Sequence, residues 1–381
     1  MAHKRSIGQY DGRQLWTCSA CGKEVRDNDI ICPHCREALS LVEAPPASGG
    51  SLPSSSNPGW QPAPAFRTYT GTFRGEGLEL FGTLLLNGIL TMLTLGIYAA
   101  WGRVKVYQFF YDNTEFAEGY FTFTGTGKEI FFGYLKAMVI FIGLYLGLIV
   151  GVMTTAPIHE MATIIVMIAW YLAILYLVQY AMFSSRRYRF SRTNFRTIHF
   201  RLEGSATEFA NEAFKNLLLS IVTLGFYLPV YFHRQFAYIY HHLRFGNVPF
   251  RYTGDEKEFY KLALPGFFLT LLTLGVYYFW WYPKMYNYYI QHLQIGEGKF
   301  HAEIQPGEYF SLMVVNLLLV VFTLGIGMAW AQVRTAKFFV EHLQLRGEFD
   351  VDRILQTAQQ TVSASGEGFA EALDMNIDLG F

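Results

Sequence analysis

Residues 250–275 read FRYTGDEKEFYKLALPGFFLTLLTLG, and this stretch decides the fold because the chain repeats its pattern. An alternating segment that ends in glycine predicts a β-strand, and the apolar run after a glutamate predicts a helix, since a first-turn carboxylate complements the helix dipole. The opening glutamates of the five copies lie 50, 79, 50 and 50 residues apart: Glu79, Glu129, Glu208, Glu258 and Glu308. Each copy carries roughly 17 to 25 uncharged residues in a row, which soluble repeats rarely do. We therefore expect an internally duplicated membrane protein.

The composition agrees with a membrane protein. Of the 381 residues, 52% are apolar and only 16% are charged, with a mean hydropathy of +0.20, whereas about a quarter of a soluble domain is charged. The charge is unevenly spread, because residues 350–381 hold one basic and six acidic residues in a chain of zero net charge. The polar N-terminus predicts no cleavable signal peptide.

The second copy is the longest and predicts the clearest transmembrane helices, at residues 137–155 and 161–183. Neither segment contains a charged residue, and each is long enough to cross a hydrocarbon core of about 30 Å. Lysines and arginines flank the outer ends of this hairpin, and its joining loop has none. The positive-inside bias then places both ends in the cytosol and the loop outside.

The other four copies predict apolar hairpins or segments near residues 80–101, 209–232, 262–282 and 309–333. A basic residue follows Thr-Leu-Gly at one repeat position: Lys105, Arg234, Lys284 and Arg334. This pattern favours hairpins, whose arms either cross fully or form re-entrant loops, over the six alternating segments that hydropathy alone would count. The strands would then lie in the cytosol and could pair, and we expect four glycines beside them to be cytosolic: Gly119, Gly246, Gly296 and Gly347. The predicted fold class is a multi-pass α-helical membrane protein built of about five β-strand-plus-helical-hairpin repeats, with a small N-terminal zinc ribbon.

The predicted zinc ribbon rests on two C-x2-C knuckles that use all four cysteines, Cys18, Cys21, Cys32 and Cys35. Such knuckles place four thiolates around one tetrahedral, structural Zn²⁺, and a module this small needs a metal to fold. The alternatives are two disulfides or a redox pair. We expect the ribbon at residues 14–41, a flexible linker rich in Pro, Ser and Gly at 42–67, the membrane domain at 68–349 and an acidic tail at 350–381. Reduced thiols favour a cytosolic N-terminus, and the hairpin topology makes the C-terminus cytosolic too.

Three asparagines, Asn87, Asn216 and Asn316, recur eight residues after the opening glutamate, inside the apolar runs. Buried asparagines in a membrane either line a polar pathway or form hydrogen bonds between helices, and the second use is the commoner one. They are the candidate intramembrane polar site.

These residues carry a family resemblance. The chain combines Glu79-Leu80-Phe81, Asn87, the run Thr94-Leu95-Gly96-Ile97-Tyr98, Trp101, Arg103, Asn113-Thr114 and the strand Phe121-Thr122-Phe123-Thr124-Gly125. This combination resembles the YjgN-like family of bacterial membrane proteins, which is built around a domain of unknown function. The resemblance covers roughly residues 68–349, and it implies several transmembrane segments in the bacterial inner membrane. It brings no catalytic or substrate-binding residues.

No enzyme template fits the sequence, which lacks a GxSxG elbow, a phosphate-binding GxxxxGK[ST] loop, an HExxH motif and a Rossmann glycine pattern. We therefore expect a non-enzymatic membrane scaffold that contacts the lipid bilayer and recruits a cytosolic protein through the zinc ribbon or the acidic tail. The alternative is a transporter or channel for a small solute, in which the recurrent asparagines would line the path. Nucleic acid is not an expected partner, and the sequence leaves the oligomeric state open.

Overall fold

The computed structural model describes residues 67–347, together with the backbone of residues 2–10, 13–18, 24–25 and 39–41. The chain divides into two compact units, Met1–Pro62 and Ala63–Phe381. In the first unit, four strands form one sheet in the order β3-β2-β1-β4. Their bounds are β1 Ala2–Tyr10, β2 Arg13–Cys18, β3 Glu24–Val25 and β4 Leu39–Leu41.

The second unit is built on a closed barrel of ten strands, in the order β10-β11-β12-β13-β14-β5-β6-β7-β8-β9. Every neighbouring pair is antiparallel, and β9 pairs with β10 to close the ring. The strands are β5 Thr68–Phe73, β6 Thr114–Phe116, β7 Gly119–Phe123, β8 Thr193–Phe195, β9 Ile198–Leu202, β10 Leu243–Phe245, β11 Val248–Tyr252, β12 Leu293–Ile295, β13 Gly298–Ala302 and β14 Leu343–Arg346.

Five helical hairpins connect these strands, one hairpin to each repeat. The helices are α1 Gly77–Leu93, α2 Ala99–Asp112, α3 Gly127–Thr155, α4 Glu160–Arg192, α5 Ala206–Val222, α6 Leu228–His242, α7 Glu256–Leu272, α8 Tyr278–Gln291, α9 Pro306–Phe322 and α10 Met328–His342. Each hairpin leaves the barrel from the end of a long strand and returns to the short strand that pairs with it. All five hairpins therefore start from one end of the barrel, and the two-residue strand turns lie at the other end.

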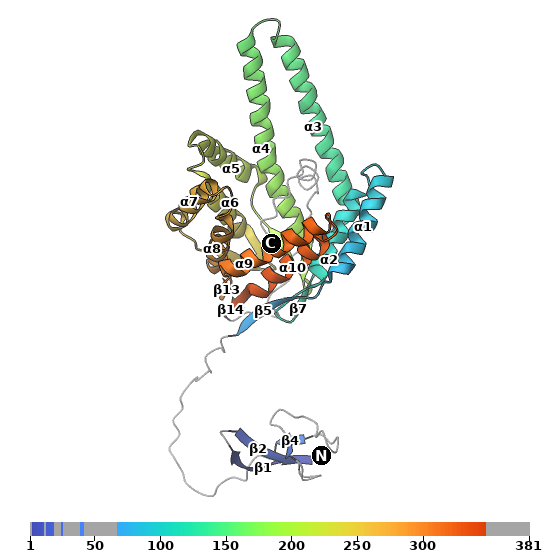
Figure 1. Ribbon diagram of the computed structural model, residues 1–381, viewed down its shortest axis with the longest axis vertical. Helices are drawn as coiled ribbons and strands as arrows, with labels where there is room; N and C mark the ends of the chain where they lie inside the picture. The colour runs from blue at the N-terminus through green and yellow to red at the C-terminus, as the bar shows by residue number, and fades with distance from the viewer. Residues whose placement is uncertain (1, 11–12, 19–23, 26–38, 42–66, 348–381) are drawn as a thin grey trace. The chain divides into compact units, whose positions relative to one another are not determined.

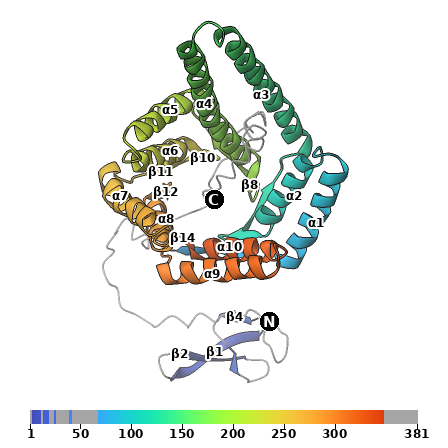
Figure 2. The ribbon, with the colours of Figure 1, turned by 45° about the horizontal axis from the view of Figure 1, so that its top comes forward.

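The hairpins form a ring around the barrel (Figures 1 and 2). The second helix of each hairpin packs on the first helix of the next, and the ring closes where α10 packs on α1. The α3–α4 hairpin projects well beyond its neighbours (Figure 1). Contacts between helices of successive repeats therefore hold the ring together, and the paired strands hold the two ends of each hairpin at the barrel.

The predicted fold class is wrong. The described repeats form a closed ten-stranded antiparallel barrel, and only α3 and α4 among the described helices are long and apolar enough to cross a membrane. In place of the predicted zinc-ribbon fold, the described N-terminal strands form a four-stranded sheet. The strands at the start of each copy were expected, but the short partner strands that close the barrel were not. Three to four residues are too few for an alternating pattern to be recognised.

The predicted linker at 42–67 and the predicted acidic tail at 350–381 lie outside the described residues, apart from Arg67. Of the four cysteines, Cys21, Cys32 and Cys35 also lie outside them, and Cys18 is described only as the last backbone position of β2.

Candidate functional site

The hairpin tips share one turn, built by the recurring Thr-Leu-Gly. In the copy at residues 94–98, the Thr94 hydroxyl donates to the Leu90 carbonyl at 2.7 Å and accepts from the Tyr98 amide at 2.9 Å. The Gly96 amide donates to the Thr91 carbonyl five residues back at 2.8 Å, which is the bond that closes a Schellman-type helix end. The copies at Thr223, Thr273 and Thr323 make the same bonds.

The leucine of this turn is both strained and exposed. It has a φ near +50° in all four copies, a left-handed conformation that costs a residue with a side chain about 1 kcal/mol. Its exposed fraction is 95% at Leu95, 85% at Leu224, 94% at Leu274 and 94% at Leu324. An apolar side chain that is held in a strained backbone and is almost fully exposed points to function rather than to packing.

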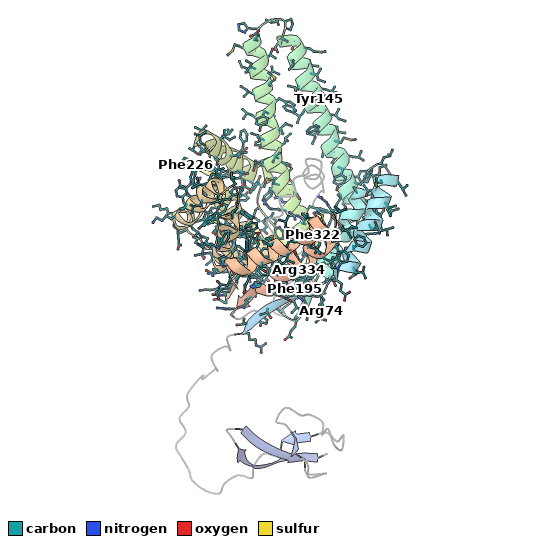
Figure 3. The ribbon with its side chains drawn as sticks, viewed as in Figure 1. Arg74, Tyr145, Phe195, Phe226, Phe322 and Arg334 are labelled. Carbon is teal, nitrogen blue, oxygen red and sulfur yellow. The ribbon has the colours of Figure 1, made fainter. Side chains whose placement is uncertain are left out.

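Large apolar side chains surround each of these leucines. The exposed ones at the four tips are Met92, Leu93, Ile97, Ile221, Val222, Phe226, Leu271, Leu272, Val276, Val321, Phe322 and Ile326. Figure 3 labels Phe226 and Phe322 among them, and places Arg334 and Arg74 nearer the strands. We call these tips the apolar crown, defined as the leucine of each Thr-Leu-Gly together with the exposed apolar residues within two positions of that motif.

The α3–α4 hairpin also exposes apolar side chains, over a greater length than the four tips. Its helices have 29 and 33 residues, and only 6% and 0% of their most apolar windows are buried. Core helices of soluble proteins are mostly buried, so this exposure separates the hairpin from them. At a rise of 1.5 Å per residue the arms extend about 43 Å and about 50 Å, which exceeds a hydrocarbon core of about 30 Å. Figure 3 labels Tyr145 on this exposed surface.

The barrel has the opposite character on its outer surface. Residues that alternate outward along the strands are polar or charged, and ion pairs join several of them, including Arg244 Nε to Glu203 Oε2 at 2.7 Å. His199 also lies on this surface, and burial together with the charge of Arg192 lowers its pKa, which favours the neutral ring. The molecule therefore has an apolar end of hairpin tips and a polar end of strands.

Inside the barrel, one level of inward side chains is mostly aromatic. The paired residues at one level are Gly71, Phe116, Phe121, Phe195, Phe200, Phe245, Phe250, Ile295, Phe300 and Leu345. Their rings contact one another around the interior, with centroids 4.8 Å apart for Phe200 and Phe245. Gly71 occupies the position of a phenylalanine because α10 lies too close: a Cβ there would be 2.5 Å from the Val340 carbonyl. Six of these side chains, Phe116, Phe195, Phe245, Phe250, Ile295 and Leu345, belong to one buried cluster, and Phe121, Phe200 and Phe300 pack against it while partly exposed.

The three predicted asparagines lie in three different hairpins. Asn87 donates to the Gly102 carbonyl at 3.1 Å, across α1 and α2. Asn316 donates to the Ala331 carbonyl at 3.3 Å and to the Thr335 hydroxyl at 2.9 Å, across α9 and α10.

Asn216 also bridges the two arms of its hairpin, where its Oδ1 is 3.5 Å from Arg234. These hydrogen bonds link each asparagine to the opposite arm of its own hairpin and not to another asparagine. The structure therefore does not bring the three together.

The equivalent position in the remaining hairpins is filled differently. In α7–α8, Gly266 replaces the asparagine, and the Trp281 indole occupies the vacated space, so that a Cβ on Gly266 would lie 1.9 Å from the ring. In α3–α4, Ala137 packs against Ala181. Three hairpins thus use different pairs at equivalent positions, Asn87 with Gly102, Asn316 with Ala331 and Gly266 with Trp281, and in each a small residue on one arm leaves room for a larger one on the other.

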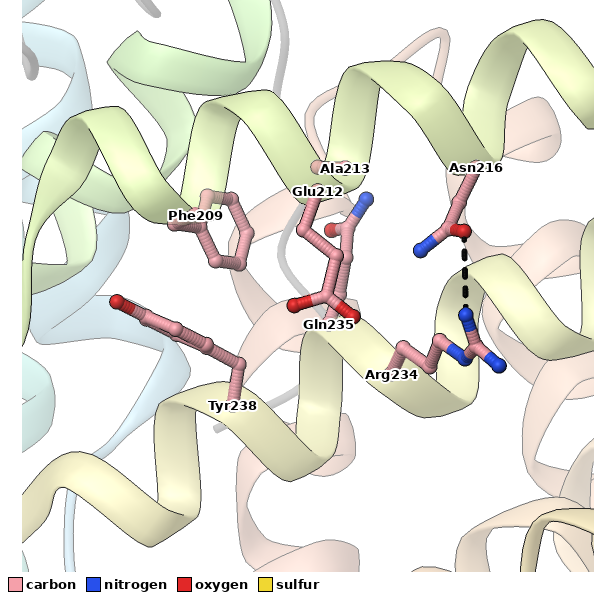
Figure 4. Close-up of a pocket in the computed structure, with 7 residues that line it drawn as sticks. All are labelled: Phe209, Glu212, Ala213, Asn216, Arg234, Gln235 and Tyr238. Atoms are coloured by element: carbon pink, nitrogen blue, oxygen red, sulfur yellow. Dashed lines mark hydrogen bonds between the residues drawn. The ribbon is translucent and has the colours of Figure 1, made fainter.

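Between α5 and α6, seven residues line a small open hollow of about 10 Å³, room for about one water molecule (Figure 4). They are Phe209, Glu212, Ala213, Asn216, Arg234, Gln235 and Tyr238. Arg234 also bonds both oxygens of Glu256 on α7, at 2.8 and 3.3 Å. Behind it, the Gln179 side chain of α4 accepts from Tyr231 at 3.0 Å and from Gln235 at 3.3 Å. This polar network joins three successive hairpins, and the spacing of Asn216 alone did not predict it.

The opening glutamates meet tyrosines from the far arm of the same hairpin. Tyr188 donates to Glu129 at 3.1 Å, and Tyr288 donates to Glu258 at 3.4 Å. Burial, and then the Glu258 carboxylate, raise the pKa of Tyr288 to about 12, so its hydroxyl stays protonated and donates. These contacts close the base of the α3–α4 and α7–α8 hairpins at the barrel.

No group of three or more His, Cys, Asp or Glu residues within the described parts of the chain could hold a metal ion. The predicted zinc ligands are outside this statement, since three of the four cysteines are not described.

Comparisons with known proteins agree with a bacterial family. A family model described as "Bacterial protein of unknown function (DUF898)" matches residues 68–282 and 265–372. A relative from Salmonella typhimurium named "Inner membrane protein YjgN" is 36% identical over 74 residues, which is 19% of each chain. A relative of the same name from Escherichia coli O157:H7 is 30% identical over 90 residues, 24% of this chain and 22% of that one. The aligned part thus spans less than a quarter of these curated relatives. No solved structure matches the chain.

Proposed function

The chain belongs to the family of bacterial proteins of unknown function DUF898, and we propose that it is an integral protein of the bacterial inner membrane that acts as a non-enzymatic scaffold. One observation carries the membrane location: α3 and α4 are long, and almost no residue in the most apolar stretch of either helix is buried. The name of its two relatives supports the same location.

In this proposal the α3–α4 hairpin crosses the bilayer, and the polar barrel stays on the cytosolic side with both chain termini. The positive-inside bias supports this orientation, because Arg186, Arg187, Arg189 and Arg192 cluster at the barrel end of α4. The loop at Ile158 then lies in the periplasm.

The scaffold role is supported by the aromatic barrel core, in which the rings of Phe250 and Phe300 stack on each other across neighbouring repeats. The N-terminal unit and the acidic residues 350–381 would recruit a cytosolic protein. Four thiolates from Cys18, Cys21, Cys32 and Cys35 would hold one structural Zn²⁺ there.

The test is a cysteine in place of Ile158, in a chain whose four native cysteines are serine. In intact cells an impermeant thiol reagent should label this position after the outer membrane is made permeable, and it should not label Tyr120→Cys on the barrel. Labelling of both positions, or of neither until the inner membrane is broken, would refute the crossing.

A further inference from the structure

A membrane crossing by α3–α4 does not explain why the tips of the four short hairpins are apolar and exposed. Their first arms have 17 residues and their second arms 14 or 15, so they reach about 25 Å and about 22 Å, short of a hydrocarbon core of about 30 Å. They cannot cross the bilayer, yet their tips are the most exposed apolar surface of the barrel unit.

The apolar surface of each short hairpin ends at the same distance from its tip along the second arm. On each second arm the seventh helical residue is basic: Lys105, Arg234, Lys284 and Arg334. It is the first Lys, Arg, Asp or Glu of its helix in three arms and the second in α2, where Arg103 precedes it. Seven residues span roughly 10 Å, and the turn adds roughly one helical pitch of 5 Å, which together equal about half of the hydrocarbon core.

The charge along the arms is consistent with that depth. No charged residue occurs between Glu308 and Arg334 or between Lys261 and Lys284. Aromatic side chains lie between the tips and the bases, as they do at a membrane surface. Lys105 Nζ, for example, lies 5.6 Å from the centre of the Tyr98 ring.

We infer that the four short tips enter only the leaflet next to the barrel, and that Lys105, Lys284 and Arg334 bind the phosphates of anionic lipids at its surface. Arg234 is left out of this lipid-binding set because it is paired with Glu256. The occupant is lipid because the surface is apolar at the tips, aromatic above them and basic at the edge, the order in which a leaflet presents hydrocarbon, interface and phosphate.

The strained leucines fit this assignment. A glycine or asparagine would relax the left-handed turn in water, and the chain instead keeps Leu95, Leu224, Leu274 and Leu324 there. Immersion in hydrocarbon stabilises these side chains, whereas exposure to water gives no compensation for the strain.

The inference rests on the proposed membrane location, and the experiment separates the two. The full-length chain without native cysteines is reconstituted into vesicles, with a fluorescent label at Leu95→Cys, Leu274→Cys or Leu324→Cys. Lipids brominated near the end of the acyl chain should quench each tip label at least twofold more than an aqueous quencher does. The same aqueous quencher should quench a label at Tyr120→Cys on the barrel. If the aqueous quencher reaches the tips as it reaches Tyr120→Cys while Ile158→Cys is labelled from the far side, the inference fails and the crossing stands.

The lipid preference is tested with a triple variant, Lys105→Gln, Lys284→Gln and Arg334→Gln. Brominated phosphatidylglycerol, a minor component of phosphatidylcholine vesicles, should quench the tip labels at least twofold more than brominated phosphatidylcholine at the same fraction, and the triple variant should abolish this difference. A control triple with the same loss of charge on the barrel, Arg251→Gln, Lys299→Gln and Arg346→Gln, should keep it. An unchanged preference in the first triple, or an equal loss in both, would overturn the assignment of these bases.

Discussion

Phe250 and Phe300 occupy the same position in successive repeats, and their rings stack inside the barrel with centroids 6.1 Å apart and planes inclined by 10°. Each also faces the interior residue of its short partner strand, Ile295 or Leu345. Sequence duplication thus becomes spatial contact: Phe250 and Phe300 lie fifty positions apart and meet because four of the five repeats place a phenylalanine at this inward position, where the first repeat has Gly71. The barrel core is therefore shared by all five repeats, and removal of one aromatic ring should lower the stability of the whole barrel.

The first prediction concerns this core. Phe250→Ala should lower the free energy of unfolding by about 3–5 kcal/mol, because a buried ring is replaced by a cavity whose neighbours belong to different repeats. Phe250→Leu should cost less, since it keeps most of the volume. The control is Tyr120→Ala on the outer surface, which should change stability by about 0.5 kcal/mol or less. Thermal unfolding of the purified protein in detergent measures all three, and an equal loss for Phe250→Ala and Tyr120→Ala would contradict the packed interior.

The second prediction separates a scaffold from a transporter. Asn316→Leu should weaken the hairpin by about 1 kcal/mol or less, as hydrogen bonds within membranes do. Thr335→Val removes the same bond from the other side, so the double variant should cost less than the sum of the two single variants.

Asn87→Leu and Asn216→Leu should likewise change any cellular phenotype only as far as they change protein abundance. Variants that are abundant, thermally intact and inactive would instead favour a path through the membrane.

Much of this architecture was within reach of the sequence, and the reason why the rest was not is physical. The fifty-residue period identified the repeats, and the glutamate and Thr-Leu-Gly marked where each hairpin starts and turns. The barrel itself was missed because its closure depends on strands such as Leu243–Phe245, whose three residues are stabilised by neighbours from other repeats. Local patterns cannot report such pairings.

At the candidate site, too, the sequence predicted some features and could not predict others. The spacing of Asn87 and Asn316 indicated a repeated polar position, but not that each reaches a carbonyl in its own hairpin. The absence of asparagine at Gly266 is explained only by Trp281, a bulky residue from the opposite arm. Sequence spacing finds equivalent positions, whereas the size of the partner across a hairpin decides which residue fits.

The third prediction concerns topology. Gly119, Gly246, Gly296 and Gly347 all lie at the strand-turn end of the barrel, but three of them have positive φ, and a Cβ at Gly119 would lie 2.7 Å from the Phe195 ring. Cysteines are better placed at exposed neighbours: Tyr120, Arg251, Lys299 and Arg346. All four should react alike and only after the inner membrane is broken, because one ring cannot lie on two sides of a bilayer. Labelling of alternate positions would contradict a single cytosolic barrel.

The fourth prediction concerns the N-terminal cysteines. The reduced full-length protein should contain one zinc per chain, because four thiolates at this spacing form one tetrahedral site. Cys32→Ser should remove most of the metal, and Ser40→Ala, in the same unit, should retain it. Membrane association should survive Cys32→Ser, since α3–α4 lies in the other unit. Metal analysis after chelation and re-addition measures the stoichiometry, and a value near zero in the metal-replete protein would exclude the site.

The fifth prediction tests whether the crossing point of each hairpin is governed by matched sizes. Gly266→Asn introduces the asparagine of the other hairpins, but a Cβ there would lie 1.9 Å from Trp281. We expect it to destabilise the protein by about 1–3 kcal/mol, as overpacked sites do. Trp281→Gly alone should also destabilise it, because it leaves a cavity.

The two changes together recreate the pair of Asn87 and Gly102, in which the amide donates to the carbonyl across the hairpin at 3.1 Å. The double variant should therefore be more stable than the sum of the single losses by 1 kcal/mol or more, about the size of coupling found between contacting residues. Thermal unfolding of the four proteins completes the cycle. Strict additivity would show that the two arms do not meet at this point, and the matched pairs in the other hairpins would then need a different explanation.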